Sequence, residues 1–248
     1  MFRRDATGSP IWIKKTLIFF IGVFTYPILK WLNNTRFAGQ EHIPEGRLQN
    51  VLFVSNHQTY FADVMVMYIA IVGRNHGCIG GVKSPAFIFH PSSNIYFIAA
   101  QETMRSGFIP HLLEMGGSVS IERTWRQAGE DVKKQVKLSE ISQIGKALAD
   151  GWVVTFPQGT TTPFVPGRRG TAHLIKKYRP TVIPVVVDGM NQAFDRKSVK
   201  INKTGVEISV RFKEPLRINY DDSPDTILAQ IMDAIEQSDS YRPKSANE

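Results

Sequence analysis

The chain has 248 residues, of which 42% are hydrophobic and 21% are charged, and its formal net charge is +8. This length and balance suit one folded α/β domain and exclude a disordered or low-complexity chain. The single cysteine, Cys78, cannot form an intrachain disulfide, so nothing in the sequence requires an oxidising compartment.

The first part of the chain combines an apolar run with basic flanks. The run Thr16–Leu29 has 14 residues, it lies between Trp12 and Trp31, and residues 1–36 carry a net charge of +5. A membrane-spanning helix needs about 20 apolar residues, whereas a shorter helix with aromatic and basic ends suits the membrane interface. We therefore predict a membrane-anchoring segment over residues 1–40 and a second domain over residues 41–248.

Two other interpretations of the apolar run stay open at this point. A buried core helix has a similar length. A cleaved signal peptide fits less well, because Lys30-Trp31-Leu32 offers no small-residue cleavage site after the run. We expect association with the cytoplasmic face of the inner or plasma membrane, and the sequence does not decide whether the helix crosses the bilayer.

Short apolar strands alternate with helical segments after residue 40. In chain order we predict strands and helices at Val51–Ser55 (strand), Ala62–Val72 (helix), Cys78–Val82 (strand), Ile95–Gln101 (helix), Ser118–Ile121 (strand), Asp131–Asp150 (helix), Trp152–Phe156 (strand), Val182–Val187 (strand), Val206–Phe212 (strand) and Pro224–Gln237 (helix). Because proline cannot donate to a strand ladder, Pro184 predicts an edge or irregular strand. The alternation predicts an α/β fold with a mostly parallel sheet and helices on both faces.

Polar residues follow directly on several predicted strands. His57, Arg123 and Gln158 each come after one. Because sites in parallel sheets gather beyond the carboxyl ends of the strands, we expect these three residues to converge on one edge.

His57 and Asp63 have the residue types of a base and the group that orients it. Residues six apart do not share a helix face, so the chain must turn between them to bring the side chains together. A carboxylate in the first turn of the following helix could accept a hydrogen bond from one imidazole nitrogen and leave the other free to act as a base. A purely structural histidine is the alternative interpretation.

At these residues the sequence resembles the 1-acyl-glycerol-3-phosphate (lysophosphatidic acid) acyltransferase family of glycerolipid acyltransferases. The resemblance extends in order over about Val51 to Val187. Its four blocks are Asn56-His57 with Asp63, the segment Gly116–Arg123, the segment Phe156–Thr162 followed by Arg169-Gly170, and Val182–Val185.

The resemblance implies an enzyme that transfers a fatty acyl group from acyl-CoA or acyl-carrier protein to the free hydroxyl of a lysophospholipid at a membrane. His57 would be the general base and Asp63 would orient it. The residues expected to bind substrate are Asn56, Arg123, Gln158, Gly159, Thr160 and Arg169. Arginine also suits phosphate by its geometry, which adds Arg168 as a candidate. No cofactor or metal is required.

The sequence departs from the family pattern at two places. Five residues separate His57 from Asp63, where the family usually has four, and we expect the turn to absorb the extra residue as a bulge. Gln158 stands where the family commonly has glutamate, which keeps the shape of the side chain but removes its charge. This second departure leaves the identity of the acceptor open.

Three functions other than that of a lysophosphatidic acid acyltransferase are compatible with parts of the sequence to different degrees. One is an acyltransferase for another lyso-lipid, such as an amino-acid-containing lipid, and another is a non-catalytic lipid-binding protein of the same fold. Nucleic-acid binding is not expected, because the basic charge is concentrated around the apolar run rather than along a folded groove.

Cys78 fits a buried core residue better than a nucleophile, and the histidines lack metal-ligand spacing.

Overall fold

The computed structural model describes residues 3–46, 49–101, 114–121 and 138–243, which contain a sheet of seven strands in the order β1-β7-β6-β2-β5-β3-β4. The strands are β1 (Asn34–Ala38), β2 (Val51–Ser55), β3 (Ile95–Ala100), β4 (Ser118–Ile121), β5 (Trp152–Thr155), β6 (Thr181–Asp188) and β7 (Glu207–Phe212). Strands β6, β2, β5, β3 and β4 run parallel, whereas β7 is antiparallel to β6 and parallel to β1. The mostly parallel α/β sheet predicted from the sequence is confirmed.

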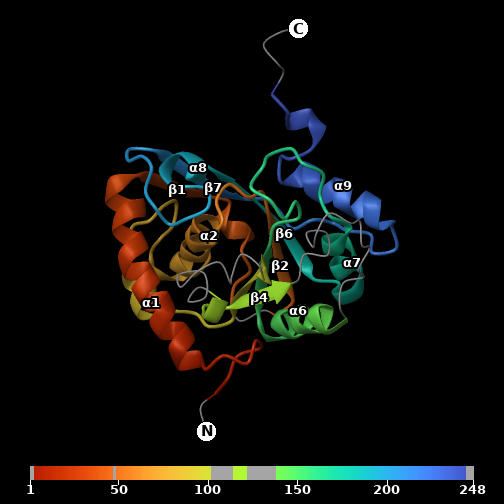
Figure 1. Ribbon diagram of the computed structural model, residues 1–248, viewed down its shortest axis with the longest axis horizontal. Coiled ribbons are helices and arrows are strands. Elements are labelled where there is room, and N and C mark those ends of the chain that lie inside the picture. The colour runs from red at the N-terminus through yellow and green to blue at the C-terminus, as the bar shows by residue number, and fades with distance from the viewer. Residues whose placement is uncertain (1–2, 47–48, 102–113, 122–137, 244–248) are drawn as a thin grey trace.

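Helices cover both faces of this sheet (Figure 1). On one side lie α1 (Ile11–Pro27), α2 (Ala62–Gly73) and α3 (Ala86–Phe89), and on the other lie α6 (Leu138–Asp150), α7 (Arg169–Tyr178) and α9 (Pro224–Ala234). Side chains of a strand alternate between the faces. Phe53 of β2 therefore packs in the core with Val66 of α2, while Leu52 of β2 packs with Ala172 of α7. All five residues of β2 are buried, because both faces are covered.

The apolar N-terminal run forms a helix, as predicted. Helix α1 continues through a π-helical turn at Ile28–Leu32, and the whole stretch Ile11–Leu32 is long and apolar enough to cross a membrane by length and composition. Strand β1 follows it and pairs with β7. Residues 34–38, which lie in the segment expected to anchor the chain, are thus part of the central sheet.

The predicted helix at Ile95–Gln101 is wrong, because Ile95–Ala100 is strand β3 between β5 and β4. Its β-branched and aromatic residues favour a strand, and Tyr96 is fully buried there.

The predicted strand at Cys78–Val82 is also not formed, apart from one isolated bridge between Arg36 and Gly81. Gly77 and Gly80 have φ of 85° and 71°. These conformations turn the chain and prevent an extended run.

The edge position predicted from Pro184 is wrong, because β6 lies between β2 and β7. The carbonyl of Pro184 accepts a hydrogen bond from the backbone N–H of Lys213, directly after β7 ends at Phe212. The N and C=O of one strand residue point to the same side, so the position of the missing N–H of Pro184 also faces Lys213, just beyond the end of β7. The proline therefore removes at most one bond, at the end of the β6–β7 pairing, and none between β6 and β2.

The last two predicted helices are seen to different extents. Only residues 138–150 of the predicted helix Asp131–Asp150 fall among the described residues, and they form α6. Helix α9 begins at Pro224, and the Ser223 hydroxyl caps it by accepting a hydrogen bond from Thr226 N.

Candidate active site

The carboxyl end of β2 is fixed to β6 by Asn56. Its side-chain Nδ2 donates to the carbonyl of Val187 at 2.8 Å, and its Oδ1 accepts from Val187 N at 2.8 Å. The amide thus extends the β2–β6 ladder by one residue after the last backbone pair. Asn56 is buried, so its role in this structure is to hold the start of the loop that carries His57.

The imidazole of His57 contacts the carboxylate of Asp63, with 2.9 Å between Nδ1 and Oδ2. The loop Gln58–Phe61 turns between them, and Asp63 lies in the first turn of α2. The five-residue spacing therefore does not separate the two side chains, as the sequence predicted.

Asp63 is fully buried and its carboxylate accepts four hydrogen bonds. Besides His57, the donors are the backbone N–H groups of Gln58 and Thr59 and the Thr59 hydroxyl. The Thr59 hydroxyl also accepts from Asp63 N at 3.1 Å, which closes a reciprocal pair at the start of α2. Such a set of donors fixes the position of the carboxylate.

The tautomer of His57 follows from this arrangement. Oδ2 of Asp63 also accepts from two backbone N–H groups and so acts as an acceptor toward His57, which puts the proton on Nδ1 and leaves Nε2 with a free lone pair. Among the described residues no side chain or backbone group bonds to Nε2, and the His57 side chain is 12% exposed. The imidazole is therefore oriented and partly accessible, as a general base must be.

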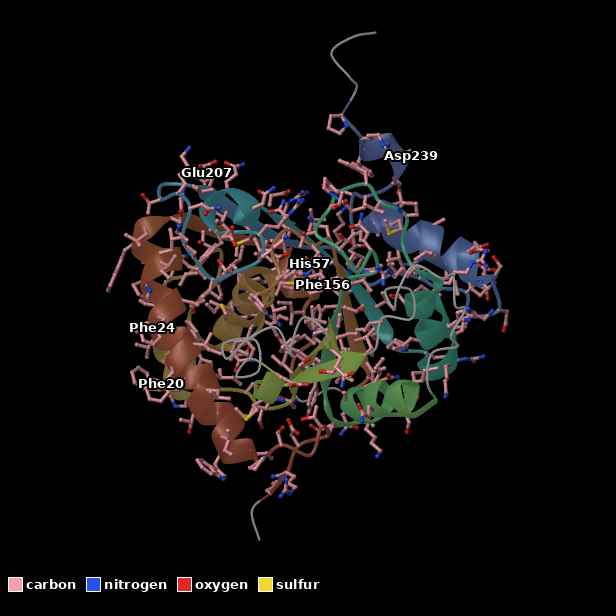
Figure 2. All side chains as sticks on the ribbon, viewed as in Figure 1. Phe20, Phe24, His57, Phe156, Glu207 and Asp239 are labelled. Carbon is pink, nitrogen blue, oxygen red and sulfur yellow. The ribbon has the colours of Figure 1, made fainter. Side chains whose placement is uncertain are left out.

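Two aromatic rings lie parallel to the imidazole. The ring of Phe156, which follows β5, stacks on His57 with 3.9 Å between centroids and a 20° interplanar angle (Figure 2). Tyr60 lies nearly parallel to His57 at 6.5 Å. Because β2 and β5 are neighbouring parallel strands, their carboxyl ends bring His57 and Phe156 together.

The turn after Phe156 is built largely from its own hydrogen bonds. Gly159 N donates to Phe156 O, and Gly159 has φ of 61°, a conformation that glycine adopts without strain. Gln158 is buried, and its Nε2 donates to Val165 O at 3.0 Å and to Gln237 Oε1 at 3.2 Å. The Gln158 amide is thus used to hold the turn, whereas Thr160 is partly exposed at its tip.

The candidate arginines have different surroundings. Arg168 donates from Nε to Gln158 O, and a Cβ on Gly159 would lie 2.9 Å from its Cζ. Arg169 is exposed and forms a two-bond ion pair with Asp225 of α9, at 2.6 and 2.8 Å. Arg168 therefore lies against the turn after β5, whereas Arg169 is paired with α9. Arg123 lies outside the described residues, although β4 ends two residues before it.

Comparison with known proteins bears on this arrangement. The chain matches the family model described as Acyltransferase over residues 34–188, which is more than half of its length. The chain belongs to the acyltransferase family. The family that the four blocks predicted is confirmed, and the matched region contains both His57 and the turn after β5.

The fold of this acyltransferase is similar to a solved structure. The crystal structure of the 1-acyl-sn-glycerophosphate (LPA) acyltransferase, PlsC, from Thermotoga maritima aligns with a TM-score of 0.55 and 16% sequence identity, covering 90% of this chain and 77% of that one. No curated protein matches the chain.

Several residues of the candidate site are not evident from the sequence. Gln237 and Arg196 reach the turn after β5 from distant segments. Phe156 could be expected near the site from the sequence, because it directly precedes the Pro-Gln-Gly turn.

Cys78 is buried, as expected for a core residue. No group of three or more metal-ligating side chains occurs within the described residues.

Proposed function

We propose that this acyltransferase moves a fatty acyl group from an acyl-CoA or acyl-carrier-protein thioester to the free hydroxyl of a lysophospholipid, with 1-acyl-glycerol-3-phosphate as the preferred acceptor. The observation that carries the proposal is the 2.9 Å contact between His57 Nδ1 and Asp63, which leaves Nε2 unbonded among the described residues. The reaction would serve phospholipid biosynthesis.

The chemistry needs one proton acceptor. Nε2 of His57 takes the proton of the acceptor hydroxyl as the oxygen attacks the thioester carbonyl carbon. The carbon–sulfur bond then breaks, and the leaving thiolate takes the proton back from the imidazolium. The buried Asp63 carboxylate stabilises the imidazolium between these steps. No residue becomes acylated, and the thioester is a substrate rather than a cofactor.

An apolar cavity lined in part by Tyr60 supports a long-chain substrate. It lies between α1, α2 and the sheet, and its lining includes Ile21 of α1, Phe97 of β3 and Tyr60. Tyr60 also lies parallel to the His57 ring. A hydrocarbon chain in this cavity would therefore end near the reacting groups.

The outer face of α1 supports attachment to a membrane. Large apolar side chains are exposed along α1 and the π-helical turn after it, at Trp12, Phe20, Val23, Phe24, Trp31 and Leu32. Figure 2 shows Phe20 and Phe24 on the side of α1 that faces away from the sheet. Phe24 is 70% and Trp31 73% exposed, and a row of such residues is unfavourable in water.

The inner face of α1 is packed against the domain, which favours a helix lying in the interface over one that crosses. Gly22 packs on Ile88, and Tyr26 packs on Phe87 of α3. Near the start of α1, Lys14 is fully buried and pairs with Asp5 at 3.1 Å. A crossing helix would have to break these contacts. We place the enzyme at the cytoplasmic face of the inner or plasma membrane.

Flotation with phospholipid vesicles tests the attachment. The double variant Phe20→Ser, Phe24→Ser should shift most of the protein from the vesicle fraction to the soluble fraction, because it removes two exposed aromatic side chains from the interface. Equal flotation of the variant and the native chain would refute this role of α1. The matched control Tyr241→Ser changes an exposed aromatic residue outside α1 and should float normally.

A panel of acceptors tests the substrate. Purified protein in detergent is given an acyl-CoA and an acyl-carrier protein, each with lysophosphatidic acid, a zwitterionic lysolipid or an amino-acid-containing lyso-lipid. The proposal predicts the highest kcat/KM with lysophosphatidic acid. Preference for another acceptor would support the alternative motivated by Gln158, and binding without transfer would support a non-catalytic protein.

A further inference from the structure

A basic loop at Asp195–Lys200 lies beside the candidate site. It follows α8 (Met190–Ala193) and contains Arg196, Lys197 and Lys200. Gln58 of the His57 loop accepts a hydrogen bond from Met190 N at 2.9 Å, so the loop that carries the base also holds the start of α8. Val199 packs against Phe61 in the small apolar cluster next to the site. The two loops are therefore in direct contact.

The basic loop has a defined conformation. Asp195 Oδ1 accepts hydrogen bonds from Lys197 N, Ser198 N and the Ser198 hydroxyl at 2.8 to 3.0 Å. The bond from the Ser198 hydroxyl is the main reason why the pKa of Asp195 is below its usual value. Asp195 N bonds in turn to Lys200 O. The only carboxylate of the loop is thus directed into the loop itself.

Arg196 connects the two sides of the site. Its carbonyl accepts a hydrogen bond from Tyr60 N at 2.9 Å, and its Nη2 donates to Thr161 O at 2.7 Å. Tyr60 belongs to the loop of the base, and Thr161 belongs to the turn after Phe156. The guanidinium is therefore held at the turn, while one carbonyl contact leaves most of its N–H groups available.

The cations of this loop form no ion pair within the described residues, although the charge of Lys200 acts on Asp195 at longer range. Arg196, Lys197 and Lys200 are exposed, and no carboxylate of the described residues forms an ion pair with any of them. The neighbouring turn carries no negative charge, because its buried side chain is the neutral amide of Gln158. An anion beside Arg196 would therefore meet positive charge, since Asp195, the one carboxylate of the loop, is bonded to Lys197 N, Ser198 N and the Ser198 hydroxyl.

We propose that Arg196 binds the phosphate of the lysophospholipid acceptor, with Lys197 and Lys200 adding positive charge around it. The proposal rests on the acyl transfer proposed above and names a residue outside the four blocks as a determinant of acceptor specificity. A guanidinium held at the turn by one carbonyl can present two further N–H groups to two phosphate oxygens. The phosphate would lie between the turn and the loop that carries His57.

Equilibrium binding in detergent micelles tests this assignment without depending on turnover. The Kd of lysophosphatidic acid and of monoacylglycerol, which lacks the phosphate, is measured for the native chain and for Arg196→Ala. The variant should raise the Kd of lysophosphatidic acid about 10- to 100-fold, as expected for charge-assisted hydrogen bonds, and leave that of monoacylglycerol within about 2-fold. The KM of lysophosphatidic acid should rise in parallel, with the KM of the acyl donor unchanged.

Two further variants make the result specific. Arg196→Lys keeps the charge and should recover part of the affinity, and it replaces Arg196→Ala if that variant does not fold. Arg217→Ala removes an exposed arginine that follows β7 and should leave both Kd values unchanged.

Equal Kd values of native chain and Arg196→Ala for lysophosphatidic acid would overturn the assignment, as would an equal loss for both ligands. A chain that binds lysophosphatidic acid through Arg196 but transfers no acyl group would instead contradict the proposed function alone.

Discussion

The two sides of the candidate site differ in how firmly their charged groups are held. On the base side, Asp63 is fully buried and accepts four hydrogen bonds, one of them from His57. On the proposed acceptor side, Arg196 is exposed, and among the described residues its side chain makes one hydrogen bond, to the carbonyl of Thr161. The fixed side suits proton transfer, which depends on geometry, and the exposed side suits recognition of a head group that arrives from a membrane.

This difference has consequences for substitution. Removing a partner from a buried, fully bonded carboxylate disturbs several groups at once. Removing an exposed side chain changes little beyond its own contact. Substitutions on the base side should therefore reduce both kcat and stability, whereas those on the acceptor side should change KM.

The largest effect is expected from Asp63→Asn. The amide can present an N–H to His57 Nδ1, which would favour the wrong tautomer, and it cannot satisfy all the N–H and O–H donors that Asp63 accepts. We expect kcat to fall at least about 100-fold and the free energy of unfolding to fall by about 2 to 3 kcal/mol. Steady-state kinetics and urea unfolding measure the two changes.

The control for this variant is Asp239→Asn, which changes a 92% exposed carboxylate that pairs with Arg242. It should leave kcat unchanged and alter stability by less than about 1 kcal/mol. A kcat of Asp63→Asn within about 3-fold of the native value would show that the carboxylate does not orient the base.

A smaller effect is expected from Gln237→Ala. Gln237 Oε1 accepts from Gln158 Nε2 at 3.2 Å and from Phe164 N at 2.9 Å, so its loss loosens the turn after β5. We expect the KM of the acceptor to rise about 3- to 10-fold with kcat nearly unchanged, and stability to fall by about 1 kcal/mol. Kinetics at varied acceptor concentration check the first result.

Gln230→Ala is the matched control on α9, since within the described residues its amide donates to Arg217 O alone. Its acceptor KM should equal that of the native chain. If the two glutamine variants behave alike, the turn does not depend on Gln237.

The smallest effect is expected from Glu236→Gln at the end of α9. Glu236 accepts from Arg211 at 2.8 and 3.0 Å and pairs with Lys213 at 2.9 Å. These contacts, the Arg211 hydrogen bonds above all, lower the pKa of Glu236 from its usual value of 4.5. A lowered pKa in the folded state stabilises the protein above the unfolded pKa, and this contribution is lost as the pH falls through the folded pKa.

The native chain should therefore be more stable than Glu236→Gln at pH 7, by less than about 1 kcal/mol because the pair is partly exposed. Thermal unfolding from pH 7 to pH 3 should show the difference shrinking once the pH falls below about 4.5. A difference that grows in acid would contradict the lowered pKa of Glu236.

The parts of the site that were predictable from sequence are local ones. The apolar run Val51–Ser55 and the spacing of His57 and Asp63 determine a strand, a turn and a helix start within 13 residues, so few conformations compete. In contrast, the helix predicted at Ile95–Gln101 is wrong, because a short apolar run has no decisive period. Its neighbours in the sheet, β5 and β4, decide that it is a strand.

The acceptor side depends on contacts between distant residues. Gln237 reaches Gln158 across 79 positions and Arg196 reaches Thr161 across 35, and neither contact leaves a pattern in the sequence. For the same reason Arg169, a reasonable phosphate residue by type, is engaged by Asp225 of α9 in the fold. Pro184 is a similar case, since its tolerance in the sheet depends on where β7 ends.

The rate of phosphatidic acid formation from acyl-CoA and lysophosphatidic acid, compared between the native chain and His57→Ala, tests the central claim most directly. The account predicts that kcat falls about 10²- to 10⁴-fold while the Kd of lysophosphatidic acid is retained, because the substitution removes the base and leaves Arg196 in place. A variant that keeps more than a tenth of the native kcat would contradict the role of His57 as the general base.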